Sequence, residues 1–416
     1  GLFQSLYSIN IMEGYQPSQP IVFPHAQHAG INGIDCKYCH NTVAKSKSAS
    51  IPSVNVCMNC HKQIDGAGKP LAPGLAWHDP RGLTEPIIKE LGDYEFRARA
   101  GALLNEIASI SKTLWLNQEY PETRKAKHFL SAPEWVAYCL GADLVNELSL
   151  VSRTGFYDVE ARAPWREAMA LVGGGEDFLA RLVVAGEPIG VVNNDAPEVL
   201  RGAVITIAGH DHFTAAYYCG AINEGSLFDS MGTAEALLRT FKKPLSRDAI
   251  AELAAANVGL SASVIADHFT LLGALPTGLT LERVCSLVGV STRDEKIALG
   301  EAALQIDPKA SALRVNNDYH GLSVTNLDDA VSPAALFRAT AEHLVEESAN
   351  MVSLIEKFTG QATEVVIAGG WVKNPMIAVA KKKQFGSYKV SDATEAGATG
   401  AAEFAGVAAG ILKLRR

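Results

Sequence analysis

The chain has 416 residues, a formal net charge of −8 and 48% hydrophobic residues. A chain of this size can bury a large core and is expected to divide into two or three domains. Its acidic balance argues against nucleic acid or an acidic membrane surface as a partner. No signal peptide is visible, and no stretch approaches the roughly 18 uninterrupted apolar residues of a transmembrane segment, so we expect a soluble, unexported chain.

Four of the seven cysteines lie close together near the start of the chain, in two copies of C-x-x-C-H at residues 36–40 and 57–61. In this motif two thiols add to the vinyl groups of one haem and the adjacent histidine binds its iron. Two further histidines precede the first copy, so four imidazoles are present for the four axial positions of two irons. The predicted haem attachment residues are Cys36, Cys39, Cys57 and Cys60, and the predicted iron ligands are His40, His61, His25 and His28.

A zinc site is the alternative interpretation, since two C-x-x-C pairs at this separation match zinc-ribbon spacing. The histidine directly after both second cysteines favours haem, because four thiolates already complete a zinc site. A coincidental or disulfide-bonded arrangement is a third interpretation. Residues 14–66 are short of large apolar side chains, so we expect this segment to fold only with its cofactor.

Residues 14–64 resemble the start of the pentahaem cytochrome c subunit of alternative complex III, a bacterial quinol-oxidising complex. The resemblance rests on GYQPSQPIVFPHAQHAGINGIDCKYCHNTVAKSKSASIPSVNVCMNCHKQI. It implies proximal iron ligands at His40 and His61, distal ligands at His25 and His28, and redox partners for the segment. Haem attachment would require export to the periplasm. The family has five such motifs, whereas this chain has two.

The rest of the chain alternates helical patterns with short β-branched runs, which is typical of an α/β protein. The pattern predicts amphipathic helices in EPIIKELGDYEFRARAG, SISKTLWLNQEYP and SPAALFRATAEHLVEESANMVSLIEKFTG, and buried strands in AVITIAG and EVVIAGG. The lysine run at residues 381–383 is interpreted as a solvated helix face rather than an anion site.

Asp211 follows the predicted strand of residues 203–209 and begins a predicted helix. The helix dipole would keep such a carboxylate ionised, and the carboxylate could accept a hydroxyl proton. From position alone, a helix N-cap is the better interpretation of Asp211.

Two glycine turns are candidates for phosphate or nucleotide contact. Gly232 and Thr233 lie between two strand-like runs, where a turn offers N–H and hydroxyl donors. Residues 364–370 predict a strand that runs into two glycines and then a helix with an early proline, which can bring backbone close to a nucleotide. Neither a GxGxxG motif nor a Walker P-loop is present.

Residues 70–412 resemble the FGGY carbohydrate kinases. The resemblance rests on AWHDPRG, SISKTLWL, SRTGFYD, the GHDH turn, SMGTAEALLR, AGGWVKNP and EAGATGAA, in this order. It implies an α/β, actin-like ATPase (ribonuclease H-like) fold of two domains. The expected division is a dihaem cytochrome c-like segment at 1–67, a first-domain remnant at 68–200 and a second domain at 201–416.

The kinase resemblance implies ATP and Mg²⁺ as cofactors, a sugar or polyol as substrate and the cytoplasm as location. Asp211 becomes the base that deprotonates the attacking sugar hydroxyl. ATP would contact Gly232, Thr233, Gly369, Gly370 and Asn374, and the sugar would approach His78, Asp79 and Arg81. A local ion pair between Asp79 and Arg81 is an equally weighted interpretation.

One family feature is not found. FGGY kinases open with a D-x-G-T turn that grips ATP phosphates and magnesium, and no such tetrapeptide occurs in the 416 residues. We therefore expect an incomplete first domain and impaired activity. The alternatives are a multihaem electron-transfer protein with a passive C-terminal scaffold, or a fusion or artefact without an integrated function.

Overall fold

The computed structural model describes residues 63–64, 70–72, 75, 79–307, 313–317, 322–327 and 331–415. All residues predicted to attach or ligate haem lie outside these ranges, as does His78. No helix in the described ranges is long and apolar enough to cross a membrane.

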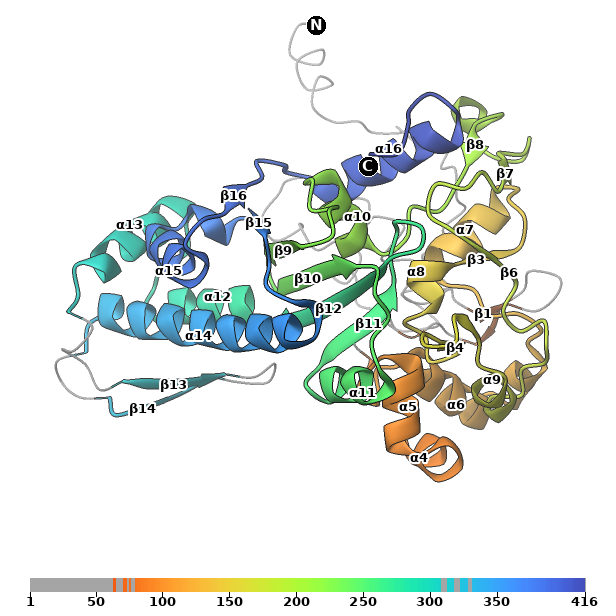
Figure 1. The fold of residues 1–416 in the computed structure, drawn as a ribbon, viewed down its shortest axis with the longest axis horizontal. Coiled ribbons are helices and arrows are strands. Elements are labelled where there is room, and N and C mark those ends of the chain that lie inside the picture. The colour runs from red at the N-terminus through yellow and green to blue at the C-terminus, as the bar shows by residue number, and fades with distance from the viewer. Residues whose placement is uncertain are drawn as a thin grey trace, which may run out of the picture.

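A six-stranded sheet forms the centre of the second half of the chain (Figure 1). Its strand order is β11-β12-β10-β9-β15-β16. The first four strands pair antiparallel, whereas β15 runs parallel to both β9 and β16. The strand bounds are β9 (Ser226–Met231), β10 (Glu235–Phe241), β11 (Val258–Ala262), β12 (Phe269–Leu275), β15 (Glu364–Ala368) and β16 (Lys389–Val390).

Different helices cover the two faces of this sheet (Figure 1). On one face, Phe228 and Leu238 pack with Phe213 of α10 and Phe404 of α16. On the other face, a larger apolar cluster joins Leu227 and neighbouring strand residues to the remaining helices. The bounds are α10 (Asp211–Tyr218), α11 (Arg247–Ala255), α12 (Thr277–Leu287), α13 (Arg293–Leu304), α14 (Pro333–Thr359), α15 (Pro375–Phe385) and α16 (Ala396–Ala408).

A two-stranded ribbon extends beside α14 (Figure 1). It consists of β13 (Arg314–Asn317) and β14 (Leu322–Thr325), which pair antiparallel. Val315 is buried, whereas the β14 side chains alternate between half-buried and exposed, as expected for a ribbon with one solvated face.

The described part of the first half contains short helices and several two-stranded sheets (Figure 1). Only β3 and β6 pair in parallel among these small sheets. The bounds are β1 (Gln63–Ile64), β2 (Pro70–Ala72), α4 (Glu85–Leu91), α5 (Asp93–Ala100), α6 (Ser109–Glu119), α7 (Ala132–Cys139), β3 (Val145–Glu147), α8 (Leu148–Val151), β4 (Tyr157–Asp158), β5 (Ala163–Pro164), α9 (Arg166–Leu171), β6 (Arg181–Val183), β7 (Gly190–Val191) and β8 (Val204–Ile205).

The two halves are joined by packing and by polar contacts between α5 and α11. Arg247 donates to Glu95 at 2.5 Å, and the Tyr94 hydroxyl donates to Asp248 at 2.5 Å. The Leu260 amide also donates to the Gly101 carbonyl, which ties the end of α5 to edge strand β11. Besides these polar contacts, one apolar cluster contains residues of both halves, including Phe96 of α5 and Leu253 of α11, so the core continues from the first half into the second.

The predicted helices are confirmed, with one interruption. The segment predicted as one helix from Glu85 is two helices, because Gly92 has a positive φ of 83° that ends α4 before α5 begins. The predicted strand at residues 364–370 is β15, which lies inside the main sheet. The predicted strand at 203–209 is shorter than expected, because only β8 pairs.

Candidate active site

Asp211 is the first residue of α10, as its position in the sequence predicts. The N-cap position belongs to His210, so the interpretation of Asp211 as an N-cap is wrong. The Asp211 side chain is 84% exposed, and one of its oxygens accepts the His212 amide at 2.8 Å. A carboxylate at this place is accessible to a ligand and faces the positive end of the helix dipole.

Neighbouring side chains and a backbone amide keep the Asp211 carboxyl acidic. Desolvation raises the pKa of Asp211, but His210, His212, the His212 amide and Arg153 together lower it below its usual range. Burial, reinforced by the Arg153 charge, lowers the pKa of His210 to about 3, so this imidazole is neutral at pH 7. Burial lowers the pKa of Arg153 to about 10, so its guanidinium stays charged. Asp211 is therefore ionised at neutral pH, as a general base must be.

Residues of the first half hold the loop that leads to Asp211. The Ser149 hydroxyl donates to Glu147 at 2.6 Å and accepts the His210 amide at 2.9 Å. Gly209 has a φ of 88°, and a Cβ there would lie 2.5 Å from the Ser149 oxygen. Burial raises the pKa of Glu147 to about 7. This packing fixes the start of α10 against α8, so the position of Asp211 depends on both halves of the chain.

Gly232 and Thr233 form the turn between β9 and β10, and both are exposed. The Gly232 amide donates to the Ala234 carbonyl at 3.0 Å, and the Thr233 carbonyl accepts the Leu279 amide at 2.7 Å. Within the described part of the chain, the Thr233 amide and hydroxyl make no hydrogen bond. These two donors are the groups that the sequence predicts for phosphate contact.

The two glycines after β15 differ in their surroundings. Gly369 has a φ of 106°, and a Cβ there would lie 2.3 Å from the Met231 carbonyl oxygen. Gly369 therefore allows the backbone after β15 to pass close to the end of β9. Gly370 is exposed and has no atom within 4 Å of an added Cβ. Of the two, Gly370 is the one with open space where a nucleotide could lie.

Asn374 is a buried helix cap. Its side-chain oxygen accepts the Met376 and Ile377 amides at the start of α15, and its amide donates to the Lys296 carbonyl at 2.7 Å. Its side chain is 4% exposed. These contacts use both the oxygen and the nitrogen of the side chain. Any contact with a nucleotide here would therefore come from the backbone near Asn374 and not from its side chain.

Asp79 and Arg81 form the local ion pair that was one of their two interpretations. The Arg81 guanidinium donates to Asp79 at 2.6 Å and stacks 4.4 Å from the centroid of the Trp115 ring. The hydrogen bond from Arg81 lowers the pKa of Asp79. The Arg81 side chain is half exposed, so it remains accessible to a ligand.

The predicted nucleotide turns lie at one edge of the main sheet, and α10, which begins with Asp211, packs on a face of that sheet. Ala368 at the end of β15 pairs with Ser230 near the end of β9, so the turns after these strands emerge at one edge. Phe213 of α10 packs in the same cluster as Ala236 and Ala368, which adjoin the two turns. The sheet and the helix packed on it thus carry residues from three motifs that are separated in the sequence.

Two contributors to this arrangement were not singled out from the sequence. Arg153 provides the charge beside Asp211, and Ser149 holds the loop before it. Arg153 lies in the SRTGFYD segment, which is one of the motifs of the family resemblance. Its position in that motif could have indicated a role near the site.

The lysine run in α15 was partly misinterpreted. Lys382 and Lys383 are exposed, but Lys381 is 1% exposed and contacts two buried carboxylates. Its Nζ lies 2.8 Å from Asp229 and 2.6 Å from Glu235. The interpretation of Lys381 as a solvated residue is therefore wrong.

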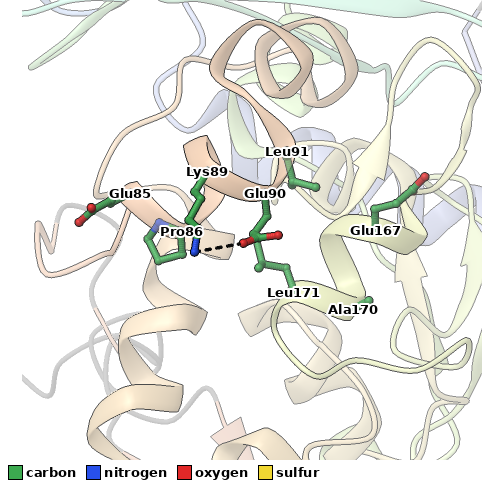
Figure 2. Close-up of a pocket in the computed structure, with 8 residues that line it drawn as sticks. All are labelled: Glu85, Pro86, Lys89, Glu90, Leu91, Glu167, Ala170 and Leu171. Carbon is green, nitrogen blue, oxygen red and sulfur yellow. Dashed lines mark ion pairs between the residues drawn. The ribbon is translucent and has the colours of Figure 1, made fainter.

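A cavity of about 620 Å³ lies elsewhere, between α4 and α9 (Figure 2). Its lining includes Lys89, Glu90, Glu167 and Leu171, and Lys89 forms a 3.7 Å ion pair with Glu90. Among the residues that the structure describes, none of those predicted to bind ATP or sugar lines this cavity. We assign it no part in the candidate active site.

The match to a known family covers part of the chain. The model of the N-terminal domain of the FGGY family of carbohydrate kinases matches residues 37–217. The matched range ends within α10 and includes Asp211. It also includes Cys39, Cys57 and Cys60.

Curated relatives are sugar kinases of low identity. The gluconokinase of Bacillus subtilis (strain 168) is 28% identical over 207 residues, which are 48% of this chain and 40% of the relative. The L-fuculokinase of Escherichia coli (strain K12) is 23% identical over 356 residues, which are 82% of this chain and 74% of that relative. The chain thus spans about 40% of the length of the gluconokinases that it matches.

Comparison with solved structures identifies the fold. The xylulose kinase from Rhodospirillum rubrum superposes with a TM-score of 0.73 at 16% identity, over 83% of this chain and 73% of that one. The chain has the fold of the sugar kinases. The Plasmodium falciparum glycerol kinase with ADP gives a TM-score of 0.71 at 17% identity, over 83% of this chain and 72% of that one. The mixed α/β, actin-like ATPase architecture predicted from the sequence is confirmed for the described residues.

Proposed function

We propose that this chain is an FGGY-family carbohydrate kinase that transfers the γ-phosphate of ATP to a hydroxyl of a sugar or polyol. The observation that carries the proposal is Asp211: an exposed, acidic carboxylate at the start of α10, a helix that packs on the sheet whose strands β9 and β15 lead to the exposed Gly232 and Gly370. The family match and the names of the relatives support the same class of reaction. ATP supply places this activity in the cytoplasm.

In the proposed reaction Asp211 accepts the proton of the sugar hydroxyl. The oxygen then attacks the γ-phosphorus, the bond between that phosphorus and the β,γ-bridging oxygen breaks, and ADP leaves with the electron pair. The Thr233 amide and hydroxyl donate to phosphate oxygens, while the open space at Gly370 admits the nucleoside. His210, His212 and Arg153 lower the pKa of Asp211, which keeps it ionised between turnovers.

Magnesium would be bound together with ATP. In nucleotide sites Mg²⁺ is typically held by one or two carboxylates and by substrate phosphates, and it neutralises phosphate charge. No group of three or more His, Cys, Asp or Glu residues clusters as a cation site within the described ranges. We therefore assign the magnesium ion no site made of protein side chains alone. The sugar is proposed to approach His78, Asp79 and Arg81.

We propose further that the 416 residues catalyse this transfer slowly by themselves. Phosphoryl transfer depends on positioning and on charge neutralisation, and the 416 residues contain no D-x-G-T turn to share this task with Gly232 and Thr233. The test is ADP release coupled to sugar, across a panel of pentuloses, hexuloses, sugar acids and polyols. Release stimulated by one class supports the proposal; release that no sugar stimulates contradicts it.

The two C-x-x-C-H motifs carry a second proposal, a dihaem c-type electron-transfer segment with its own redox partners. Each motif supplies two thiols and a proximal imidazole at the spacing that one haem requires. Haem supplies one-electron transfer when it is bound, and its attachment would take place in the periplasm.

If the chain is exported in cells with a cytochrome c maturation system, both motifs are expected to bind haem covalently. A denaturing gel stained for haem peroxidase activity checks this, because thioether-bound haem stays with the chain. The matched control replaces Cys36, Cys39, Cys57 and Cys60 by serine and should lose the stain. An unstained band for the matured, exported protein, or stoichiometric zinc instead, contradicts the haem proposal.

A further inference from the structure

A buried polar cluster lies beneath the Gly232–Thr233 turn. Asp229 on β9 and Glu235 on β10 are both 0% exposed and flank the turn in sequence. Lys381 of α15 contacts both carboxylates, and the Ser348 hydroxyl of α14 donates to Glu235 at 2.6 Å. The cluster thus joins two strands to two helices in the layer that covers this face of the sheet.

Glu235 uses its two carboxylate oxygens for different purposes. Oε1 accepts from Lys381 at 2.6 Å and from Ser348, which anchors the side chain in the core. Oε2 accepts the Thr277 hydroxyl at 2.7 Å, and Thr277 is the first residue of α12. Oε2 therefore holds the start of α12 against the first residue of β10.

The start of α12 also contacts the turn itself. The Leu279 amide donates to the Thr233 carbonyl, and a Cβ at Gly278 would lie 1.9 Å from the Gly232 carbonyl oxygen. The turn is thus held from two sides, by its own strand end at Glu235 and by the helix that Glu235 anchors. This leaves the Thr233 amide and hydroxyl directed by a rigid frame.

We infer that Glu235 is a positioning residue for the turn that binds phosphate, acting through Thr277 on the first turn of α12. That the turn binds phosphate rests on the proposed kinase function. That Glu235 holds the turn in place concerns the chain without a ligand and is tested there. The bonds from Lys381 and Ser348 would be enough to satisfy the buried carboxylate of Glu235. The bond from Thr277 does more, because it holds the first turn of α12, whose Leu279 amide donates to the Thr233 carbonyl.

The inference separates two variants that each remove one hydroxyl donor to Glu235. Thr277→Val removes the donor that connects Glu235 to α12, and Ser348→Ala removes a donor on α14 while Lys381 still holds the same oxygen. Both hydroxyls are buried, but that of Ser348 also accepts from Lys381 at 2.9 Å and from Gln384 at 3.1 Å, so Ser348→Ala is the more disruptive loss and therefore a stringent control. Thr277→Ser keeps the hydroxyl and serves as the conservative variant.

Backbone hydrogen exchange of the full chain without nucleotide is the test. Thr277→Val is expected to speed exchange of the Gly232 and Leu279 amides by about tenfold or more, while Ser348→Ala and Thr277→Ser leave these two amides within about threefold of the wild type. Equal acceleration by Thr277→Val and Ser348→Ala, or none by Thr277→Val, overturns the inference. Binding of ATP is measured separately on the wild type, so its absence would contradict the kinase proposal while leaving this result readable.

Discussion

Replacing Lys381 by methionine is expected to lower the free energy of unfolding by about 3–5 kcal/mol at pH 8. The substitution keeps the length of the side chain but leaves two fully buried carboxylates, Asp229 and Glu235, without their cation. Lys382→Met is the matched control, because Lys382 belongs to the same helix and is exposed. It is expected to change stability by less than about 0.5 kcal/mol. Chemical denaturation of both variants checks the difference.

The loss in Lys381→Met should be smaller at pH 5 than at pH 8. Burial, together with the neighbouring Glu235 charge, raises the pKa of Asp229 to about 7. A carboxyl whose folded pKa lies above its unfolded value binds the proton more tightly when folded, so its contribution to stability falls as pH rises from about 4 through 7. Without Lys381 that pKa rises further, and more of the penalty appears at high pH. A loss independent of pH would show that Asp229 is not the group responsible.

Asp211→Asn is expected to reduce sugar-dependent phosphoryl transfer by about 10²–10⁴-fold, with little change in the binding of ATP. Asparagine keeps the size of the side chain but cannot accept the hydroxyl proton as a base. Asp211 is exposed, and among the described residues its carboxylate accepts a hydrogen bond from the next residue alone, so the fold should tolerate the change. Single-turnover transfer from radiolabelled ATP, with the chain in excess over ATP, measures even a slow rate.

The pH profile of the same reaction distinguishes a base from a binding residue. The lowered pKa of Asp211 predicts a rate that is constant across neutral pH and falls only in acid, as the carboxylate becomes protonated. His212→Gln is a useful comparison, since it alters the same helix turn but keeps the carboxylate. Transfer rates that are equal in Asp211→Asn and the wild type would remove Asp211 from the mechanism.

Several local features could be predicted because their causes are local. An apolar β-branched run followed by glycines predicted β15, and the proline of the Asn-Pro pair before MIAVAKKKQFG predicted the start of α15. Asp211 could be placed at the start of a helix for the same reason. The sequence also identified the β9 to β10 turn, since Gly-Thr separates two strand-like runs.

Other features depend on which side chains meet in space. Lys381 lies four residues after buried Ile377, so helical spacing places both on the inner face of α15. Because Lys381 was considered together with Lys382 and Lys383, all three were interpreted as solvated. Its partners Asp229 and Glu235 are charges within apolar strands, a pattern that indicates buried pairing. Their common contact required knowledge of the sheet order. The same holds for Arg153, whose charge reaches Asp211 across the interface between the two halves.

The binding of magnesium ATP tests the central claim, a nucleotide site at the exposed glycine turns, most directly. Isothermal titration calorimetry would compare the wild type with Gly370→Val and with Gly175→Val, a control glycine that is likewise exposed and has no atom within 4 Å of an added Cβ. We predict weak binding to the wild type and to Gly175→Val, and an affinity lower by about tenfold or more, ~1.4 kcal/mol, for Gly370→Val. No binding to the wild type, or equal affinity in all three proteins, would contradict the account.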